Sequence, residues 1–379
     1  MSIPSWQQQI IATVSKSPPK IALTGIFLLL FLLPLTSSCT LAQMPEKRIS
    51  RERSPEATPQ QQPSDNNGSQ ESIAYQGRQR RILRERSPEA TPQQQPTDNN
   101  DTQERMTYQG RLRTYILHTP KDYTPNRSMP LVLVFHGGNG RGRSVQRNSG
   151  FNDLADQNGF FVAYPDGIDR HWNDGRLDTD NPDVDDVGFV AALIDHLVKT
   201  KNIDSSRVYA TGISNGGAMV LKLACDLSDK IAAFAPVASS LSVRLASSCK
   251  PSKPVSILMF NSPDDPYMPW EGGMGRGRGG MKLSVPETVE WWRKHNDCSP
   301  QADNNTLPRT AASDGTRVRV SRYSGGCSGT EVVLYTIEGG GHTWPGGQLS
   351  RREREFGTTS RQVNASEVMW EFFQRHALP

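Results

Sequence analysis

The sequence has few apolar residues, which make up 35% of its 379 residues. Soluble domains usually contain about 45–50%, glycine included, so part of this chain lies outside any packed core. Neither sign of charge is in large excess: 43 basic and 39 acidic residues give a net charge of +4, which argues against a nucleic-acid-binding protein. Only one long apolar run is present, which excludes several membrane spans. The abundant residues are 32 glycines and 27 prolines, which favour many loops and disfavour a helical bundle.

The single apolar run lies near the N-terminus, at residues 21–35, and follows Lys16 and Lys20. It is shorter than the ~20 residues that a membrane span needs. A basic stretch before a short apolar stretch is typical of an export signal. Small residues then lead to Cys39, as in bacterial lipoprotein signals, so three alternatives remain: lipidation at Cys39, simple secretion, or an uncleaved anchor. We therefore predict that residues 1–39 are a signal peptide or lipoprotein signal, and that the protein is exported, secreted or tethered to a membrane by its N-terminus.

A direct repeat explains the low apolar content. Residues 51–83 recur as residues 84–116, and both copies begin with RERSPEATPQQQP. The repeat is rich in proline, glutamine, asparagine and arginine, and it cannot bury enough apolar surface to offset the entropy of the chain. We therefore expect residues 40–107 to form a disordered linker, followed by one folded domain at residues 108–379.

The remaining chain alternates between strand-like and helical segments. Residues 113–118 alternate as in a strand, whereas residues 130–135 and 159–164 are short continuous apolar runs of the kind found in buried parallel strands. Further strands are expected at residues 206–211, 231–237, 255–260 and 331–337. Apolar residues at helical spacing occur at residues 187–198, at 215–227, and after Asn364. This alternation predicts an α/β fold, with a mostly parallel sheet and helices on both of its faces.

The clearest chemical motif is GISNG at residues 212–216, between a predicted strand and a predicted helix. G-x-S-x-G in that context is typical of a nucleophile elbow, a tight turn in which glycines avoid clashes and the serine is presented at a helix N-terminus. A serine hydroxyl is a weak nucleophile at neutral pH and needs a base. The motif therefore predicts Ser214 as a nucleophile that acts with a partner elsewhere in the chain.

Candidate partners follow two later strands. His342 lies in a glycine-rich segment after the strand at 331–337, and these glycines would let the loop carry the imidazole over the sheet. Asp264 and Asp265 follow the strand at 255–260, and either carboxylate could orient the imidazole. The chain order serine, aspartate, histidine is that of α/β-hydrolases.

Donors for a developing oxyanion are expected after the strand at 130–135, where the chain reads HGGNG. Backbone N–H groups in such a glycine-rich turn are accessible. We predict that one donor comes from Gly137, Gly138 or Asn139, and that the N–H of Asn215 supplies the other.

Several motifs, in the order HGGNG, AYPDG, VDDVGF, GISNGGAM, DPYMPWEGG and GGGHTWPGG, resemble the polyhydroxybutyrate depolymerase/feruloyl esterase family of α/β-hydrolases. The resemblance spans roughly residues 110–376 and implies Ser214 as nucleophile and His342 as base. It places the acid on Asp265 rather than Asp264, because the family's acid precedes Pro-x-x-Pro. One departure is the segment at 261–263, Asn-Ser-Pro, where the family often has His-Gly-Thr.

Other residues complete the expectations. Trp172, Trp270 and Trp344 lie beside the motifs and could line an acyl or sugar pocket, although core packing would explain them nearly as well. The acidic segment at 178–186 lacks the glycine and the final glutamate of a calcium loop, so we expect no metal, and Asp185 or Asp186 should cap the following helix.

No C-x-x-C occurs, and short loops favour the disulfides Cys225–Cys249 and Cys298–Cys327, with four buried thiols as the alternative.

These observations predict an exported serine carboxylic-ester hydrolase that needs no cofactor and binds no nucleic acid. The resemblance implies an ester substrate, either hydroxycinnamoyl esters on plant polysaccharide or hydroxyalkanoate esters. A peptidase with the same triad and a non-catalytic surface-binding lipoprotein are the alternatives.

Overall fold

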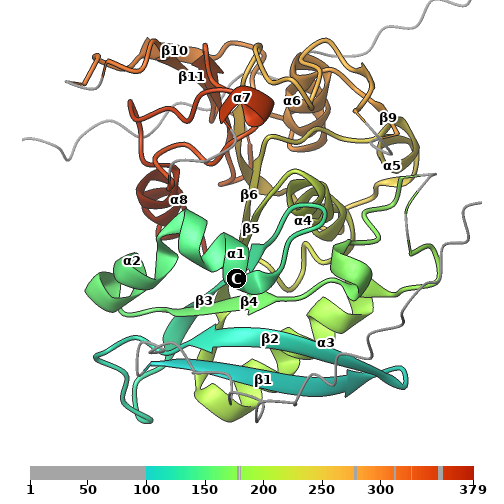
Figure 1. Ribbon diagram of the computed structural model, residues 1–379, viewed down its shortest axis with the longest axis vertical. Helices are drawn as coiled ribbons and strands as arrows, with labels where there is room; N and C mark the ends of the chain where they lie inside the picture. The colour runs from blue at the N-terminus through green and yellow to red at the C-terminus, as the bar shows by residue number, and fades with distance from the viewer. Residues whose placement is uncertain are drawn as a thin grey trace, which may run out of the picture. The chain divides into compact units, whose positions relative to one another are not determined.

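The computed structural model describes residues 100–379, except 177, 178, 180, 277–279, 311–312, 326 and 349–352 (Figure 1). The predictions for residues 1–39, for Cys39 and for most of the linker therefore concern residues outside the described part of the chain. Within that part, no helix has the length and apolar character needed to cross a membrane.

The domain is built on a ten-stranded sheet with the order β1-β2-β4-β3-β5-β6-β7-β12-β11-β10. The strands from β4 to β12 in this order run parallel, and the outer strands are antiparallel, which confirms the mostly parallel sheet that the sequence predicts. The strands are β1 Asp101–Tyr108, β2 Arg111–His118, β3 Met129–Phe135, β4 Phe161–Pro165, β5 Ile203–Ile213, β6 Ala233–Val237, β7 Ser256–Asn261, β10 Asp303–Thr306, β11 Arg317–Tyr323 and β12 Val332–Glu338.

Helices cover both faces of this sheet (Figure 1). The two apolar cores divide alternate residues of the same strand: Leu131 and Leu133 pack with α3 and α4, whereas Val132 and Val134 pack with α2 and α8. This division follows from the two-residue period of a strand. The helices are α1 Gly142–Ser149, α2 Phe151–Asn158, α3 Asp186–Lys201, α4 Asn215–Asp226, α5 Val243–Ser248, α6 Val285–His295, α7 Glu353–Phe356 and α8 Ala365–Phe373.

The predicted start of the folded domain at residue 108 is too late. Strand β1, Asp101–Tyr108, pairs with β2 along its whole length, from Asp101 opposite His118 to Tyr108 opposite Arg111. Its residues are mostly polar because it lies at the edge of the sheet, so its composition resembles that of the linker before it. The second copy of the repeat thus ends inside the folded domain.

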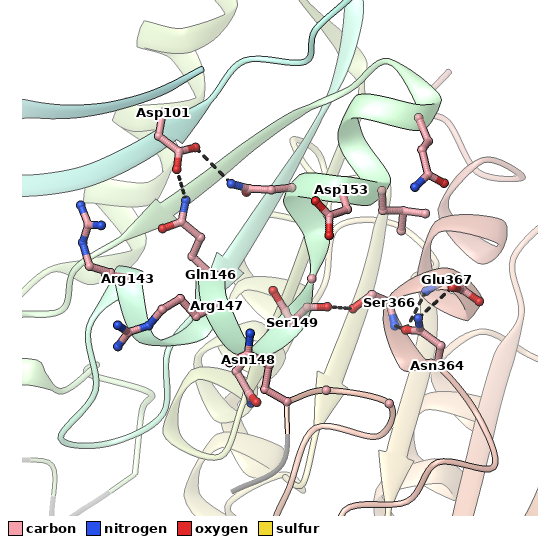
Figure 2. A pocket seen from close by; sticks show the side chains of 17 residues that line it. Asp101, Arg143, Gln146, Arg147, Asn148, Ser149, Asp153, Asn364, Ser366 and Glu367 are labelled. Atoms are coloured by element: carbon pink, nitrogen blue, oxygen red, sulfur yellow. Dashed lines mark hydrogen bonds between the residues drawn. The ribbon is translucent and has the colours of Figure 1, made fainter. Parts of the chain in front are cut away.

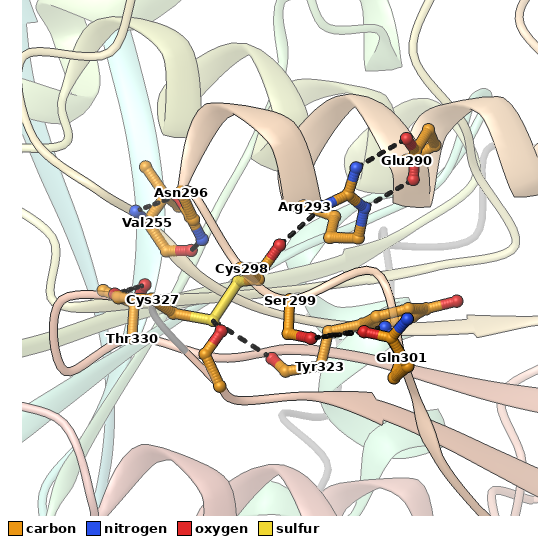
Figure 3. Close-up of a disulfide and its surroundings, with 11 residues drawn as sticks. Val255, Glu290, Arg293, Asn296, Cys298, Ser299, Gln301, Tyr323, Cys327 and Thr330 are labelled. Atoms are coloured by element: carbon orange, nitrogen blue, oxygen red, sulfur yellow. Dashed lines mark hydrogen bonds and ion pairs between the residues drawn. A yellow bond between two sulfur atoms is a disulfide. The ribbon is translucent and has the colours of Figure 1, made fainter.

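Two disulfides join neighbouring elements, with the pairing that the loop lengths favour. Cys225 on α4 is bonded to Cys249, which follows α5, with a Cα–Cα distance of 5.0 Å. Cys298, after α6, is bonded to Cys327, before β12 (Figure 3). Arg293 links this second bridge to α6, because it donates to the Cys298 carbonyl and pairs with Glu290.

Candidate active site

Four loops that follow strands β3, β5, β7 and β12 meet at the carboxyl ends of these strands, where ligands bind in open α/β sheets. They contribute Gly137, Ser214, Asp265 and His342 respectively. A cavity of about 1190 Å³ opens there and is lined by Ser214, His342, Gly137, Gly138 and Asn215, among others. The parallel sheet therefore brings these predicted site residues together, although they are far apart in the sequence.

Ser214 occupies a tight turn between β5 and α4, with φ 59° and ψ −119°. A positive φ is uncommon for a residue with a side chain and typically marks a functional turn. The turn needs its glycines: a Cβ at Gly216 would lie 2.4 Å from the Phe135 carbonyl oxygen, and one at Gly212 would lie 2.8 Å from Phe135 Cβ. This is the geometry that the GISNG motif predicts, with Ser214 at the N-terminus of α4.

His342 is held by Asp265. Its Nδ1 lies 2.8 Å from Asp265 Oδ2 and 3.1 Å from Oδ1, and the Asp265 side chain is 1% exposed. Asp265 Oδ1 also accepts the backbone N–H groups of Tyr267 and Met268. Because an ionised carboxylate can only accept, Nδ1 carries the imidazole proton and leaves Nε2 as an acceptor.

Asp264, the other candidate acid, is exposed and contacts the loop instead of the imidazole. Its Oδ2 accepts the N–H of Gly339 at 2.7 Å, and Ser262 Oγ donates to the Gly340 carbonyl at 2.7 Å. Both contacts anchor the glycine-rich segment that carries His342. Ser262 belongs to the segment that departs from the family's His-Gly-Thr, and no sequence pattern pointed to this anchoring role.

Ser214 and His342 line the same cavity, but no hydrogen bond joins them in the described part of the chain. Nucleophile–base hydrogen bonds are often long without substrate and shorten when it binds. The arrangement is therefore compatible with proton transfer from Ser214 to His342.

The turn after β3 offers backbone donors beside Ser214. A Cβ at Gly137 would lie 3.4 Å from Ser214 Cβ, and one at Gly138 would lie 3.8 Å from Asn215 Cβ. Asn139 N–H already donates to the Arg170 carbonyl, which leaves Gly137 and Gly138 as the candidate donors of this turn.

His136 fixes the orientation of this turn. Its Nδ1 lies 2.8 Å from the Gly137 carbonyl oxygen, which also accepts the N–H of Gly140 at 3.0 Å. Its Nε2 accepts the N–H of Gly167 at 3.0 Å, so the proton of the neutral ring lies on Nδ1. Burial lowers the pKa of His136 and favours this neutral form.

A buried network fixes the first residue of α4. Asn215 Oδ1 accepts the N–H of Trp172, and its Nδ2 donates to Asp174 at 2.9 Å. Asp174, 2% exposed, in turn pairs with Arg176. These side-chain contacts hold Asn215 in place, and its backbone N–H is the second donor that the sequence predicts.

The tryptophan predictions are partly wrong. Trp172 is fully buried in the core, packs edge-on against Phe135 and donates to the His136 carbonyl, so it supports the turn after β3 rather than lining a pocket. Trp270 packs against the core and is not part of the cavity lining. Trp344 borders the cavity but is only 1% exposed. Core packing accounts for Trp172 and Trp270, whereas Trp344 lies at the cavity as expected.

Other aromatic and apolar side chains line the cavity instead. The Tyr267 ring lies 5.1 Å from the His342 ring and stacks on Phe356 of α7 at 5.3 Å. Met268 follows directly and also lines the cavity. The DPYMP segment contained a signal for Tyr267 and Met268, whereas nothing in the sequence pointed to Phe356.

A second hollow, of about 900 Å³, adjoins this cavity (Figure 2). Arg147, Asn148 and Gln348 line both spaces. Figure 2 shows Arg143 and Arg147 projecting from α1, with Asn364 and Glu367 across the hollow. Its lining is mostly polar, and Gln348 belongs to the same loop as His342.

Comparison with known proteins identifies the family. Residues 113–253 match the family described as "Esterase PHB depolymerase". NocK from Nocardia uniformis subsp. tsuyamanensis, whose name assigns it provisionally to the esterases, is 34% identical over 254 residues, which cover 64% of this chain and 73% of NocK. The chain belongs to the PHB depolymerase/feruloyl esterase family. This esterase is therefore a carboxylic ester hydrolase of the α/β-hydrolase superfamily, as the motifs imply.

Two further similarities are more distant. Feruloyl esterase B from Piromyces equi is 29% identical to this esterase over 239 residues, which cover 61% of the chain but 42% of that protein. The solved structure of an acetyl xylan esterase from Aspergillus awamori is 15% identical, with a TM-score of 0.47, and the match covers 69% of this chain and 94% of that one.

Proposed function

We propose that Ser214, His342 and Asp265 are the catalytic triad of this esterase. The observation that carries the proposal is that His342, held by Asp265, lines the same cavity as a serine on a strained turn. Ser214 Oγ attacks the ester carbonyl carbon while His342 Nε2 accepts its proton. The imidazolium then protonates the leaving alcohol, and an acyl-enzyme remains.

Deacylation uses the same groups. His342 Nε2 takes a proton from water, whose oxygen attacks the acyl carbon, and Ser214 leaves with that proton. The backbone N–H groups of Gly138 and Asn215 stabilise the oxyanion in both steps, with Gly137 as the alternative donor. Asp265 keeps the imidazole in the required tautomer throughout.

For the substrate, we propose feruloyl-type esters on plant polysaccharide. His342 must reach the leaving oxygen, so the alcohol part lies on the side of the loop that carries it. The second hollow is on that side, and polar side chains in its lining, such as those of Asn148 and Gln348, can form hydrogen bonds with the hydroxyl groups of a carbohydrate. Feruloyl esterase B among the relatives adds support. Hydroxyalkanoate esters, which the family name suggests, are the second candidate.

We further propose that the esterase is exported, with residues 1–39 as the targeting segment and residues 100–379 as the catalytic domain. Two disulfides in the domain support an oxidising compartment. Lipidation of Cys39, simple secretion and an uncleaved anchor are the alternative forms of this proposal, and mass spectrometry of the exported protein's N-terminus distinguishes them.

A fluorophosphonate probe and a substrate panel test the catalytic proposal. The probe should label the wild-type protein and fail to label Ser214→Ala. This variant should also lose nearly all of its esterase activity. The panel contains methyl ferulate, 4-nitrophenyl butyrate and hydroxybutyrate polymer. Labelling that persists in Ser214→Ala contradicts the triad, and absence of labelling and hydrolysis in the wild type favours a non-catalytic binding protein. Faster turnover of the polymer than of methyl ferulate contradicts the polysaccharide proposal.

A further inference from the structure

Lys282 is a lysine inside the cavity wall that the proposed mechanism does not use. It lies in β9, Met281–Lys282, which pairs with β8, Gly273–Met274. Its backbone also pairs in antiparallel fashion with that of Ser242. The residue is only 7% exposed, yet it lines the same cavity as Ser214 and His342. Lysine is seldom buried to this extent unless its charge is paired.

The ammonium group of Lys282 has few hydrogen-bond acceptors or counter-charges to offset the cost of its burial. In the described part of the chain its one hydrogen bond is to the Ser240 carbonyl, at the long distance of 3.5 Å. The charged groups that act on it are Asp174 and Arg176. Asp174 is already bonded to Arg176 and Asn215, so the nearby carboxylate is shared with another cation.

This arrangement is costly without a ligand. An ammonium group has three donors, and burying it without an acceptor or counter-ion opposes folding. Burial accordingly lowers the pKa of Lys282. A neutral hydroxyl in the cavity would supply an acceptor but no charge, whereas a carboxylate would supply both.

The rest of the cavity lining favours the same kind of ligand. Its cationic residues are Arg147, Arg176, Arg276 and Lys282, whereas its acidic residues are Asp174 and Glu355. The acidic members are engaged, Asp174 with Arg176 and Glu355 with the Tyr267 hydroxyl. The cavity therefore presents an excess of positive charge to an incoming ester.

We propose that Lys282 is a specificity-determining residue that binds a carboxylate carried by the ester substrate. The carboxylate could belong to the far end of the acyl group or to an acidic sugar of the alcohol part, and the chemistry at Lys282 is the same for both. This inference rests on the proposed function, because it assigns Lys282 to the cavity where Ser214 acts.

Two pairs of esters test the proposal and separate the two sources of the carboxylate. The acyl pair is the mono-4-nitrophenyl ester of adipic acid and 4-nitrophenyl hexanoate. The alcohol pair is the feruloyl ester of glucuronic acid and that of glucose. The measured quantity is the ratio of kcat/KM for the charged member to that for the neutral member, in the wild type, Lys282→Met, Lys282→Arg and Lys253→Met. Lys253 is an exposed lysine outside the cavity lining and serves as the control.

We expect the wild type to prefer the charged member of one pair. A hydrogen-bonded charge contact at Lys282 should change the ratio by ~10-fold to ~100-fold. Lys282→Met should abolish the preference, Lys282→Arg should retain part of it, and Lys253→Met should keep it. No preference in either pair for the wild type, which needs no variant to fold, overturns the inference, as does a preference that survives in Lys282→Met. If Ser214→Ala still hydrolyses the neutral esters, the proposed function fails instead.

Discussion

Replacing Asp265 by asparagine tests how the acid acts on His342. Asp265 Oδ1 accepts the backbone N–H groups of Tyr267 and Met268 at 2.8 and 2.9 Å, whereas Oδ2 faces His342 Nδ1 at 2.8 Å. An asparagine must satisfy the two backbone donors with its carbonyl oxygen, because its NH₂ group cannot accept a hydrogen bond. The NH₂ group then takes the place of Oδ2 and donates to His342 Nδ1.

That donation reverses the tautomer of the imidazole. Nδ1 becomes the acceptor, so the proton of neutral His342 lies on Nε2, which can no longer accept the proton of Ser214. A wrong tautomer in a Ser-His-Asp enzyme costs about 10⁴-fold in kcat, so we expect a loss of ~10³-fold to ~10⁴-fold for Asp265→Asn. The melting temperature should change little, because the replacement has the same shape and keeps the backbone contacts.

Initial rates with 4-nitrophenyl butyrate measure the loss, with Ser214→Ala as the floor. Asp264→Asn is the matched control: it is the same substitution one residue away, and its carbonyl oxygen can still accept the N–H of Gly339. It should keep most of the wild-type activity. A larger loss in Asp264→Asn than in Asp265→Asn, or more than about a tenth of the wild-type kcat in Asp265→Asn, would refute the reasoning.

Three further predictions concern stability. Burial opposes the charge of His118, but hydrogen bonds to Asp101 and Asp156 raise its pKa above 6.5. Protonated His118 therefore stabilises the folded state fully below pH ~6.5, and this contribution is lost as the pH rises through the higher folded-state pKa. The melting temperatures of wild type and His118→Asn should consequently converge with rising pH. A chain that begins at residue 109 should melt at least ~4 °C below one that begins at residue 100, because it lacks β1; equal melting temperatures would show that β1 contributes nothing. Replacing Cys225 and Cys249 together by alanine should lower the free energy of unfolding by ~2–4 kcal/mol in denaturant titrations, and no change would contradict a bridge between them.

Local sequence patterns predicted the features that depend on local geometry. The apolar runs of the parallel strands are continuous because both sheet faces are covered, so strands such as β3 and β7 could be located within a residue or two. The GISNG turn has few alternatives, because its glycines meet Phe135 and leave no room for a Cβ. The geometry at Asp265 and His342 also agrees with the acid and base that the family motifs imply.

Features that depend on tertiary packing could not be predicted in this way. The polar composition of β1 resembles that of the linker, and only its pairing with β2 distinguishes the two. Trp172 stands beside a motif whether it packs beneath the loop or lines the pocket, and the outcome depends on the Phe135 ring and the His136 carbonyl. The burial of Lys282 has no sequence signal at all, because a single lysine in a glycine-rich segment is typical of a surface loop.

The hydrogen bonds around Gly137 have a consequence for the energy of the reaction. A peptide group is planar, so fixing the Gly137 carbonyl through His136 and Gly140 also fixes the direction of the Gly138 N–H on the other side of the bond. In water, dipoles must turn toward an oxyanion as its charge develops, and that reorientation adds to the barrier. Here the dipole is already preorganised by folding, so in the proposed mechanism it stabilises the transition state without a further reorganisation cost.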